Sequence, residues 1–224
     1  MIACRHHAEN RRRPHKTFAK SRNSAQIAVA LANADCRTFK HCINMIFETD
    51  RLVLRPWLES DAEDLYLYAR DPQVGPIAGW PQHTSVENSL EIIRTVLSKP
   101  ETYAIALKTD NRAIGSIGLM FNGDGIAPIG DTEAELGFWV GVPHWGHGYA
   151  PEASRRLLRH AFDDLNQTAV WCGYYDGNQK SKRAQEKIGF IYHHTIENVN
   201  VPLMGDVRTA HMNLLTRERW NCMA

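Results

Sequence analysis

Residues 137–153 read Gly137-Phe138-Trp139-Val140-Gly141-Val142-Pro143-His144-Trp145-Gly146-His147-Gly148-Tyr149-Ala150-Pro151-Glu152-Ala153. This stretch predicts an apolar strand, a glycine-containing turn, and an amphipathic helix that begins near Tyr149 or Ala150. Because Gly146 and Gly148 lack a Cβ atom, the turn can take positive φ angles and bring backbone N–H groups close to a ligand. The helix that follows adds unpaired N–H groups and the positive end of its dipole. The stretch therefore predicts a cradle for a phosphate or pyrophosphate, with an ordinary strand-to-helix turn as the alternative.

Two common phosphate-binding patterns do not fit this turn. Its glycines are not spaced as Gly-x-Gly-x-x-Gly, and no Gly-Lys-Ser/Thr follows them. The spacing therefore gives little support to a dinucleotide site or a nucleoside triphosphate site.

The turn resembles the acyl-coenzyme A loop of the GNAT superfamily of N-acetyltransferases, whose pattern is Gln/Arg-x-x-Gly-x-Gly/Ala. This chain has Trp145-Gly146-His147-Gly148-Tyr149-Ala150, so Trp145 departs from the Gln or Arg of the pattern. The Trp-Gly-x-Gly-Tyr-Ala form resembles the RimJ/RimL branch, which acetylates ribosomal-protein N-termini and other amines. The resemblance runs from about Phe47 to about Thr216. It implies a mixed α/β fold with a mostly antiparallel sheet of about seven strands, splayed at the acyl-CoA site and flanked by about four helices.

A second motif lies after the next predicted strand. Asn178-Gln179-Lys180-Ser181 ahead of Glu186-Lys187-Ile188-Gly189-Phe190 resembles the family's Asn-x-x-Ser…Glu-Lys-x-Gly-Phe. By itself Asn178 is an ordinary N-cap, with Ser181 in the first helical turn. Many superfamily members place a tyrosine, the usual acid, four residues before the glycine of this helix. Gln185 stands there in this chain, which leaves Ser181 or a bound water as the alternative acid.

The resemblance implies acetyl-CoA as the cosubstrate and assigns residues to it. The second motif would contribute Asn178, which bonds the pantetheine arm, and Ser181, which lies near the sulfur. The Val140 N–H is the candidate contact for the developing oxyanion. The loop would bind the pyrophosphate through the backbone N–H groups of His147, Gly148, Tyr149 and Ala150. The preceding strand would pair with the pantetheine arm through Trp139, Val140, Gly141 and Val142.

Glu135 is the candidate general base. Strand alternation places it on one face with Glu133, Gly137 and Trp139. It resembles the glutamate that several relatives use, directly or through water, to accept the amine proton. The alternative is a solvated or salt-bridged strand glutamate. An α-amine with a pKa near 8 needs less help than a lysine near 10.4, so a water-mediated base would suffice for an N-terminal acceptor.

The acceptor is expected beside residues 71–83. Pro72, Gly75, Pro76, Gly79 and Pro81 predict that no regular element forms there. In the RimJ/RimL pattern this loop helps form the acceptor pocket, and the candidate substrate contacts are Tyr68, Trp80 and His83. The alternative for Trp80 is that it attaches the loop to the core.

Apolar periodicity and turn residues predict the remaining elements. Strands are expected at 48–57, 103–108, 113–120, 133–141, 169–174, 190–199 and 207–215. Helices are expected at 60–70, 84–97, about 149–165 and 179–188. Residues 122–132, rich in Gly and Asp, are expected to form a loop.

The charge of the chain is unevenly distributed. Residues 1–44 hold nine of the 26 Lys and Arg residues but only two of the 25 acidic ones, so the rest of the chain is acidic. Residues 1–45 are expected to form a basic, disordered extension. It has three interpretations: an organellar transit peptide, an RNA-binding arm, or an over-extended start with Met45 as the natural one. The transferase domain is then expected at 46–218, with residues 219–224 as a C-terminal tail.

Composition narrows the location and partners of the chain. Five cysteines without a Cys-x-x-Cys indicate free thiols in a reducing compartment, so a cytoplasmic location is expected. His144-x-x-His147 and His193-His194 lack Cys or acidic partners at metal spacing, so no metal is expected. The acidic body does not favour nucleic acid, no segment predicts a membrane span, and the protein is expected as a monomer or homodimer.

The resemblance to the GNAT superfamily implies an N-acetyltransferase. It would move an acetyl group from acetyl-CoA to a primary amine, either a protein N-terminal α-amine or a small-molecule amine, by direct attack in a ternary complex. A catalytically silent acyl-CoA sensor that lost the usual acid at Gln185 is the alternative. An RNA-associated protein acting through the basic segment is a third possibility.

Overall fold

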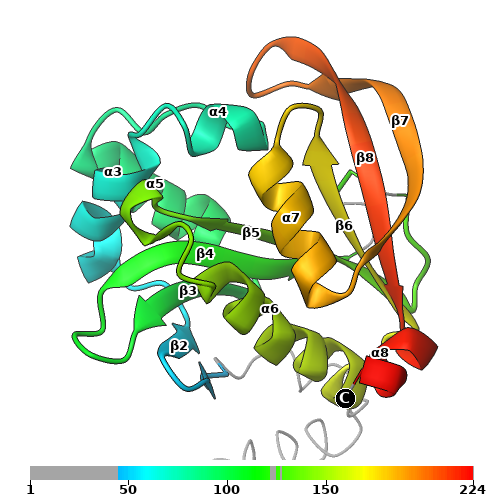
Figure 1. Ribbon diagram of the computed structural model, residues 1–224. Coiled ribbons are helices and arrows are strands. Elements are labelled where there is room, and N and C mark those ends of the chain that lie inside the picture. The colour runs from blue at the N-terminus through cyan, green and yellow to red at the C-terminus, as the bar shows by residue number, and fades with distance from the viewer. Residues whose placement is uncertain (1–44, 122–124, 127, 224) are drawn as a thin grey trace, which may run out of the picture. The chain divides into compact units, whose positions relative to one another are not determined.

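A computed structural model describes residues 45–121, 125–126 and 128–223 (Figure 1). Residues 44–224 form one compact unit. The predicted basic segment therefore lies outside the described residues, except for Met45. The predicted loop at 122–132 also lies partly outside them, and its described residues form neither helix nor strand.

One sheet organises the described chain. Its strand order is β1-β2-β3-β4-β5-β6-β8-β7, and every neighbouring pair is antiparallel except β5 and β6. The fold class and the mostly antiparallel sheet are confirmed. The strands are Phe47–Glu48 (β1), Leu52–Arg55 (β2), Thr102–Leu107 (β3), Ala113–Met120 (β4), Glu133–Val140 (β5), Ala169–Tyr175 (β6), Ile191–Val201 (β7) and Asp206–Thr216 (β8).

Six α-helices accompany the sheet in the described residues. They are Ala62–Ala69 (α3), Gly75–Ala78 (α4), Val86–Ile92 (α5), Tyr149–Arg159 (α6), Gln179–Ile188 (α7) and Arg217–Met223 (α8). Short π-helical turns at Ile93–Leu97 and His160–Asp164 extend α5 and α6. The strand expected at 48–57 is divided into β1 and β2, which accounts for the eighth strand. The expected C-terminal tail lies largely in α8, where the Trp220 ring stacks on Phe162 at 5.5 Å.

The prediction that residues 71–83 contain no regular element is wrong. The helix α4 forms there because a proline is tolerated in the first turn, where its missing N–H has no helical partner. Pro76 occupies that position, and Gly79 closes the helix with a φ of 93°. Glycine and proline can delimit one helical turn as well as prevent it, so their presence at 71–83 does not exclude a short helix.

Two hydrophobic clusters occupy opposite faces of the sheet, because successive side chains of a strand point to opposite sides. Ile105 packs in the cluster that contains Leu157 of α6 and Ile188 of α7. The adjacent Ala104 packs in the cluster that contains Leu65 of α3 and Ile93. Figure 1 shows α6 and α7 together on the near face.

The sheet opens between β5 and β6. Their parallel pairing covers Glu133–Glu135 opposite Ala169–Trp171. Beyond these residues the two strands continue without pairing to each other, while β5 stays paired with β4 as far as Val140. The expected splay is therefore confirmed, and it places an edge of β5 inside the protein.

Within the described residues, every helix falls short of the length and apolar character that a bilayer span requires.

Candidate functional site

The turn that contains Gly146 and Gly148, here called the glycine turn, lies between β5 and α6. Gly146 and Gly148 both have φ angles of 79°, and Gly148 is the N-cap of α6. A Cβ atom added at Gly146 would meet nothing within 4 Å, so the turn borders open space. Pro151 is the third helical residue and has no N–H, so the donors at this helix end are the N–H groups that precede it. The predicted strand, turn and helix are thus present, and their backbone can approach an anion.

Contacts from an earlier part of the chain hold the turn in place. Glu152 of α6 accepts hydrogen bonds from Thr49 Oγ1 (2.6 Å) and from the backbone N–H (3.0 Å) and Nε (2.7 Å) of Arg51. Arg51 Nη1 also donates to the carbonyl oxygen of His147 at 3.0 Å. Burial alone would raise the pKa of Glu152, but the hydrogen bonds from Thr49 and Arg51 outweigh it and lower that pKa. The turn between β1 and β2 therefore supports the glycine turn.

Trp145 joins the two walls of the site. Its Nε1 donates to the Val140 carbonyl oxygen at 2.7 Å. The ammonium of Lys180, on α7, lies 3.4 Å from the centre of its ring. The residue that departs from the family's Gln or Arg thus links the end of β5 to the start of α7.

The edge of β5 offers backbone groups to the gap. The Gly141 N–H donates to the Ile114 carbonyl oxygen of β4 at 2.8 Å. Because residues of an antiparallel strand alternate in direction, the N–H and C=O groups of Val140 and Phe138 point away from β4. They point to the side on which β6 has already separated. An extended ligand segment could therefore pair with β5 there.

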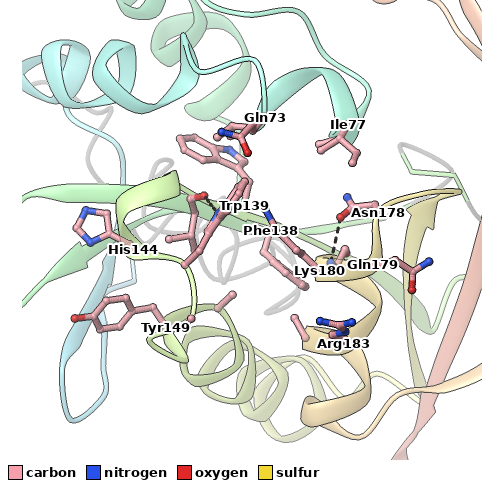
Figure 2. Close-up of a pocket in the computed structure, with 18 of the residues that line it drawn as sticks. Gln73, Ile77, Phe138, Trp139, His144, Tyr149, Asn178, Gln179, Lys180 and Arg183 are labelled. Carbon is pink, nitrogen blue, oxygen red and sulfur yellow. Dashed lines mark hydrogen bonds between the residues drawn. The ribbon is translucent and has the colours of Figure 1, made fainter.

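A cavity of about 630 Å³ fills the gap between β5 and α7. Figure 2 shows Phe138 and Trp139 at its centre, His144 and Tyr149 on one side, Asn178 and Lys180 on the other, and Gln73 and Ile77 above. Seven of the ten expected cofactor contacts line it: Trp139, Val140, Gly148, Tyr149, Ala150, Asn178 and Ser181. The other three, Gly141, Val142 and His147, do not line this cavity.

The start of α7 forms one wall of the cavity. Asn178 is the N-cap, and its Oδ1 accepts the Ser181 N–H at 3.1 Å. The expected capping role is present, and both residues also line the cavity. Gln185, one turn further along α7, is buried, and its Nε2 donates to Ser181 Oγ at 3.0 Å. Lys180, Arg183 and Lys187 give this wall a positive charge.

Glu135 lies apart from the cavity lining. It is 3% exposed and sits at the last pair before β5 and β6 separate. A Cβ atom added at Gly125 would overlap its carboxylate, so the carboxylate lies against that backbone. Burial is the main cause that raises the pKa of Tyr175, at the end of β6, and the negative charge of Glu135 adds to the rise. The carboxylate therefore lies against Gly125 and is not part of the cavity lining.

The three expected acceptor contacts occupy two separate places. The Trp80 ring packs against Trp139 at 5.6 Å and against His83 at 5.6 Å between ring centres. The Nδ1 of His83 is 2.8 Å from Ser89 Oγ, and burial lowers the pKa of His83. Tyr68 instead lies behind the turn, where its hydroxyl is 3.1 Å from His144 Nε2. The structure thus brings Trp80 and His83 together and separates Tyr68 from them.

Several residues of the site belong to no motif recognised in the sequence. Gln73, Ile77 and Ala78 line the cavity from α4 and the segment before it, which was expected to be an acceptor loop. Arg51 and Glu152 were not identified, although Glu152 lies inside the quoted stretch. An acidic residue in the first turn of α6 beside a proposed anion site is the signal that could have drawn attention to it, because its negative charge repels the anion unless a cation offsets it.

The chain matches the family described as Acetyltransferase (GNAT) domain over residues 51–191. It is similar to YoaA of Bacillus subtilis (strain 168), named an uncharacterized N-acetyltransferase, with 26% identity over 150 residues, which are 65% of this chain and 82% of YoaA. It is also similar to the uncharacterized N-acetyltransferase p20 of Bacillus licheniformis, with 29% identity over 147 residues, 63% of this chain and 80% of p20.

Solved structures share the fold. An acetyltransferase of the GNAT family from Bacillus anthracis superposes with a TM-score of 0.67 at 19% identity, covering 78% of this chain and 99% of that one. A "putative ribosomal-protein-serine acetyltransferase" from Vibrio cholerae superposes with a TM-score of 0.64 at 19% identity, covering 77% and 98%. At these identities the likeness shows the fold alone.

Proposed function

This chain belongs to the GNAT family of acetyltransferases, and from that premise we propose that it transfers an acetyl group from acetyl-CoA to a primary amine. The acceptor is a protein N-terminal α-amine or a small-molecule amine, and it attacks the thioester directly in a ternary complex. The observation that carries the proposal is the cavity that runs from the glycine turn along the free edge of β5 to Ser181.

The residues around this cavity fit acetyl-CoA. Its volume of about 630 Å³ is in the range of small-molecule sites. The glycine turn, open at Gly146, suits the pyrophosphate. The N–H and C=O groups of Phe138 suit the amide-containing pantetheine arm, which would lie as an added strand, whereas the Val140 carbonyl already accepts Trp145 Nε1. Lys180 and Arg183 add positive charge for the phosphates. When bound, acetyl-CoA supplies an acyl group activated by a sulfur leaving group.

The backbone and side chains at the splay then have defined tasks. The Val140 N–H donates to the carbonyl oxygen on which negative charge develops, as in other oxyanion sites. Glu135 accepts the proton that the amine loses, through a water, because the carboxylate does not reach the cavity lining. The indole rings of Trp80 and Trp139 form the wall on the acceptor side. Within the family, the Trp145–Ala150 motif resembles the RimJ/RimL branch, which leaves both an N-terminal α-amine and other amines as acceptors.

Calorimetric titration of acetyl-CoA tests the cofactor site. We expect the wild-type protein to bind at micromolar concentration and the Gly148→Glu variant to lose binding, because a carboxylate in the turn repels the pyrophosphate. Gly205→Glu is the matched control. Gly205 also has a positive φ, 66°, and it lies in the turn between β7 and β8, away from the cavity lining. The two variants therefore add the same charge with the same kind of backbone strain.

A thiol-release screen against peptides and small amines follows the titration. Release with an amine supports the transferase. A folded wild-type protein that does not bind acetyl-CoA, or a Gly205→Glu variant that loses binding as fully as Gly148→Glu, would contradict the proposed site. Binding without thiol release for every amine would favour the silent acyl-CoA sensor instead.

A further inference from the structure

Gln185 occupies the center of a buried chain of side-chain hydrogen bonds behind the cavity. It is fully buried on α7, facing β6 and β8. Its Nε2 donates to the Gly173 carbonyl oxygen of β6 at 3.1 Å and to Ser181 Oγ at 3.0 Å. Its Oε1 accepts from Nδ2 of the buried Asn213, on β8, at 2.7 Å. The chain Asn213–Gln185–Ser181 thus connects the interior of the sheet to the cavity wall.

The direction of these hydrogen bonds is determined by one backbone group. The Gly173 carbonyl can only accept a hydrogen bond, so the amide nitrogen of Gln185, and not its oxygen, must face it. An amide nitrogen has two N–H groups and accepts none. The second N–H of Gln185 is therefore directed at Ser181 Oγ, and Gln185 Oε1 faces the donor of Asn213.

This direction leaves the hydroxyl proton of Ser181 available. The Oγ atom receives the Gln185 N–H, and the backbone N–H of Ser181 is bonded to Asn178 Oδ1. Within the described part of the chain, Ser181 Oγ donates no hydrogen bond. Ser181 also lines the cavity. Its O–H is therefore a donor directed by Gln185 and left for a ligand atom.

We propose that Gln185 and Asn213 are positioning residues that make Ser181 a hydrogen-bond donor to the sulfur of the acyl donor. The inference rests on the proposed function. In the step, the amine nitrogen bonds to the acetyl carbonyl carbon, the bond from that carbon to sulfur breaks, and its electron pair leaves on sulfur as a thiolate. The amine proton passes through water to Glu135. The hydroxyl proton stays on Ser181, whose hydrogen bond stabilises the thiolate.

This role gives Gln185 a function that the family's tyrosine does not have. A glutamine side chain does not release a proton at physiological pH, so it cannot act as the acid itself. It acts through Ser181, whose high intrinsic pKa suits donation of a hydrogen bond better than transfer of a proton. The absence of the tyrosine is then compatible with turnover.

A double-mutant cycle in the full chain tests the inference. The variants are Ser181→Ala, Gln185→Met and the combination of both. We expect each single variant to lower kcat about 10- to 100-fold, as for a lost hydrogen bond to a charged group. The combination is expected to be no slower than Ser181→Ala alone, because Gln185 has nothing left to position. A purely structural Gln185 would slow the Ser181→Ala protein by the same factor as the wild-type protein.

A second readout does not depend on turnover. Calorimetry of coenzyme A in buffers of different ionisation enthalpy counts the protons that binding releases. Because the Ser181 donor favours the thiolate, the wild-type protein is expected to release more protons with coenzyme A than with S-methyl coenzyme A. Ser181→Ala and Gln185→Met should each reduce the difference. Lys180 and Arg183, the cations of the same wall, are present in every variant. Their effect on proton release is therefore the same in each protein and does not alter the comparison between variants.

Two further variants complete the design. Gln167→Met is the matched control, since Gln167 is a buried glutamine that donates to the Leu165 carbonyl oxygen away from the cavity. It is expected to change neither readout. If Gln185→Met does not fold, Asn213→Leu removes the partner of Oε1 and should reduce the same proton release.

The outcomes separate the inference from the proposed function. Coenzyme A binding with the expected proton release but no acetyl transfer to any amine would contradict the transferase and keep the Ser181 donor. Acetyl transfer with an additive cycle and unchanged proton release would overturn the positioning role and keep the transferase. Failure of coenzyme A to bind the folded protein would contradict both.

Discussion

Glu133 and Glu135 lie two residues apart on one face of β5, but only one of them is proposed to carry a proton. Glu133 accepts the indole N–H of Trp171 at 2.9 Å and the Gly130 N–H at 3.1 Å, so its carboxylate has a structural task. Glu135 is buried at the last residue pair before β5 and β6 separate. Its negative charge adds to the effect of burial in raising the pKa of Tyr175. The two glutamates differ in position because the pairing between β5 and β6 ends at Glu135.

Glu135→Gln is therefore expected to lower kcat about 10²- to 10⁴-fold, the usual contribution of a general base. The affinity for acetyl-CoA should change little, because Glu135 does not line the cavity. Steady-state kinetics together with calorimetry measure both quantities. The rising limb of the pH profile should also disappear with the carboxylate.

Glu133→Gln is the matched control at the residue scale, since it makes the same chemical change on the same face of the same strand. It is expected to leave kcat within a few-fold of the wild-type value. Equal losses of kcat for the two variants would show that the glutamates act through the stability of β5, and the assignment of Glu135 as base would be withdrawn.

At the scale of elements, the turn between β1 and β2 stabilises the N-terminal start of α6. Donors from Thr49 and Arg51 converge on Glu152, and Arg51 also donates to the His147 carbonyl and lies 4.6 Å over the Tyr149 ring. These contacts join segments about a hundred residues apart, directly behind the glycine turn. The turn is therefore ordered before any ligand binds, which reduces the entropy that binding must overcome.

Glu152→Gln is expected to weaken acetyl-CoA binding by roughly 3- to 10-fold, because the charge-assisted hydrogen bonds that order the turn become neutral ones. Calorimetry measures the change. Glu59→Gln is the control, since Glu59 forms an ion pair with Arg94 at 2.7 Å on the exposed surface, where such pairs contribute little. A Glu152→Gln protein with unchanged affinity would show that the turn keeps its shape without this anchor.

The same carboxylate gives a test with acid. Because the folded protein lowers the pKa of Glu152, its contribution to stability is present above the ordinary carboxyl pKa of about 4.3. That contribution is lost as the pH falls through the lowered folded value. Chemical denaturation between neutral and acidic pH should therefore show a smaller loss of stability for Glu152→Gln than for the wild-type protein.

At the scale of the whole molecule, His160 connects the end of α6 to the beginning of β3. It is 1% exposed, and its Nε2 is 3.2 Å from Glu101 Oε2 while its Nδ1 is 2.8 Å from Asp164 Oδ2. Its ring also packs on Phe47 of β1 at 4.7 Å. Three parts of the described chain therefore meet at one imidazole.

The pH dependence of global stability should report this connection. Burial lowers the pKa of His160, but Glu101 and Asp164 outweigh burial, and the pKa is raised. A raised folded pKa stabilises the protein fully below the unfolded value, about 6.5, and this stabilisation is lost as the pH rises through the folded value. Urea unfolding is expected to show stability decreasing across this window. His160→Gln should flatten the decrease, and substitution of the exposed His193 should leave it in place.

The sequence by itself determined the features that depend on short stretches of backbone. The strand–turn–helix around Gly146 and Gly148, the N-cap at Asn178 and the left-handed Gly189 that ends α7 all follow from the local conformational preferences of a few neighbouring residues. The order of strands and helices follows from apolar periodicity in the same way. These preferences act over a few residues, so they can be recognised in the sequence.

Only the tertiary structure decided which side chains meet. It placed Glu135 outside the cavity lining, separated Tyr68 from Trp80, formed α4 over the cavity, and directed the hydroxyl of Ser181 through Gln185 and Asn213. Each of these outcomes depends on contacts between residues far apart in the chain. Such contacts are selected by packing and by the need to satisfy every buried polar group, and both are properties of the folded chain rather than of any local pattern.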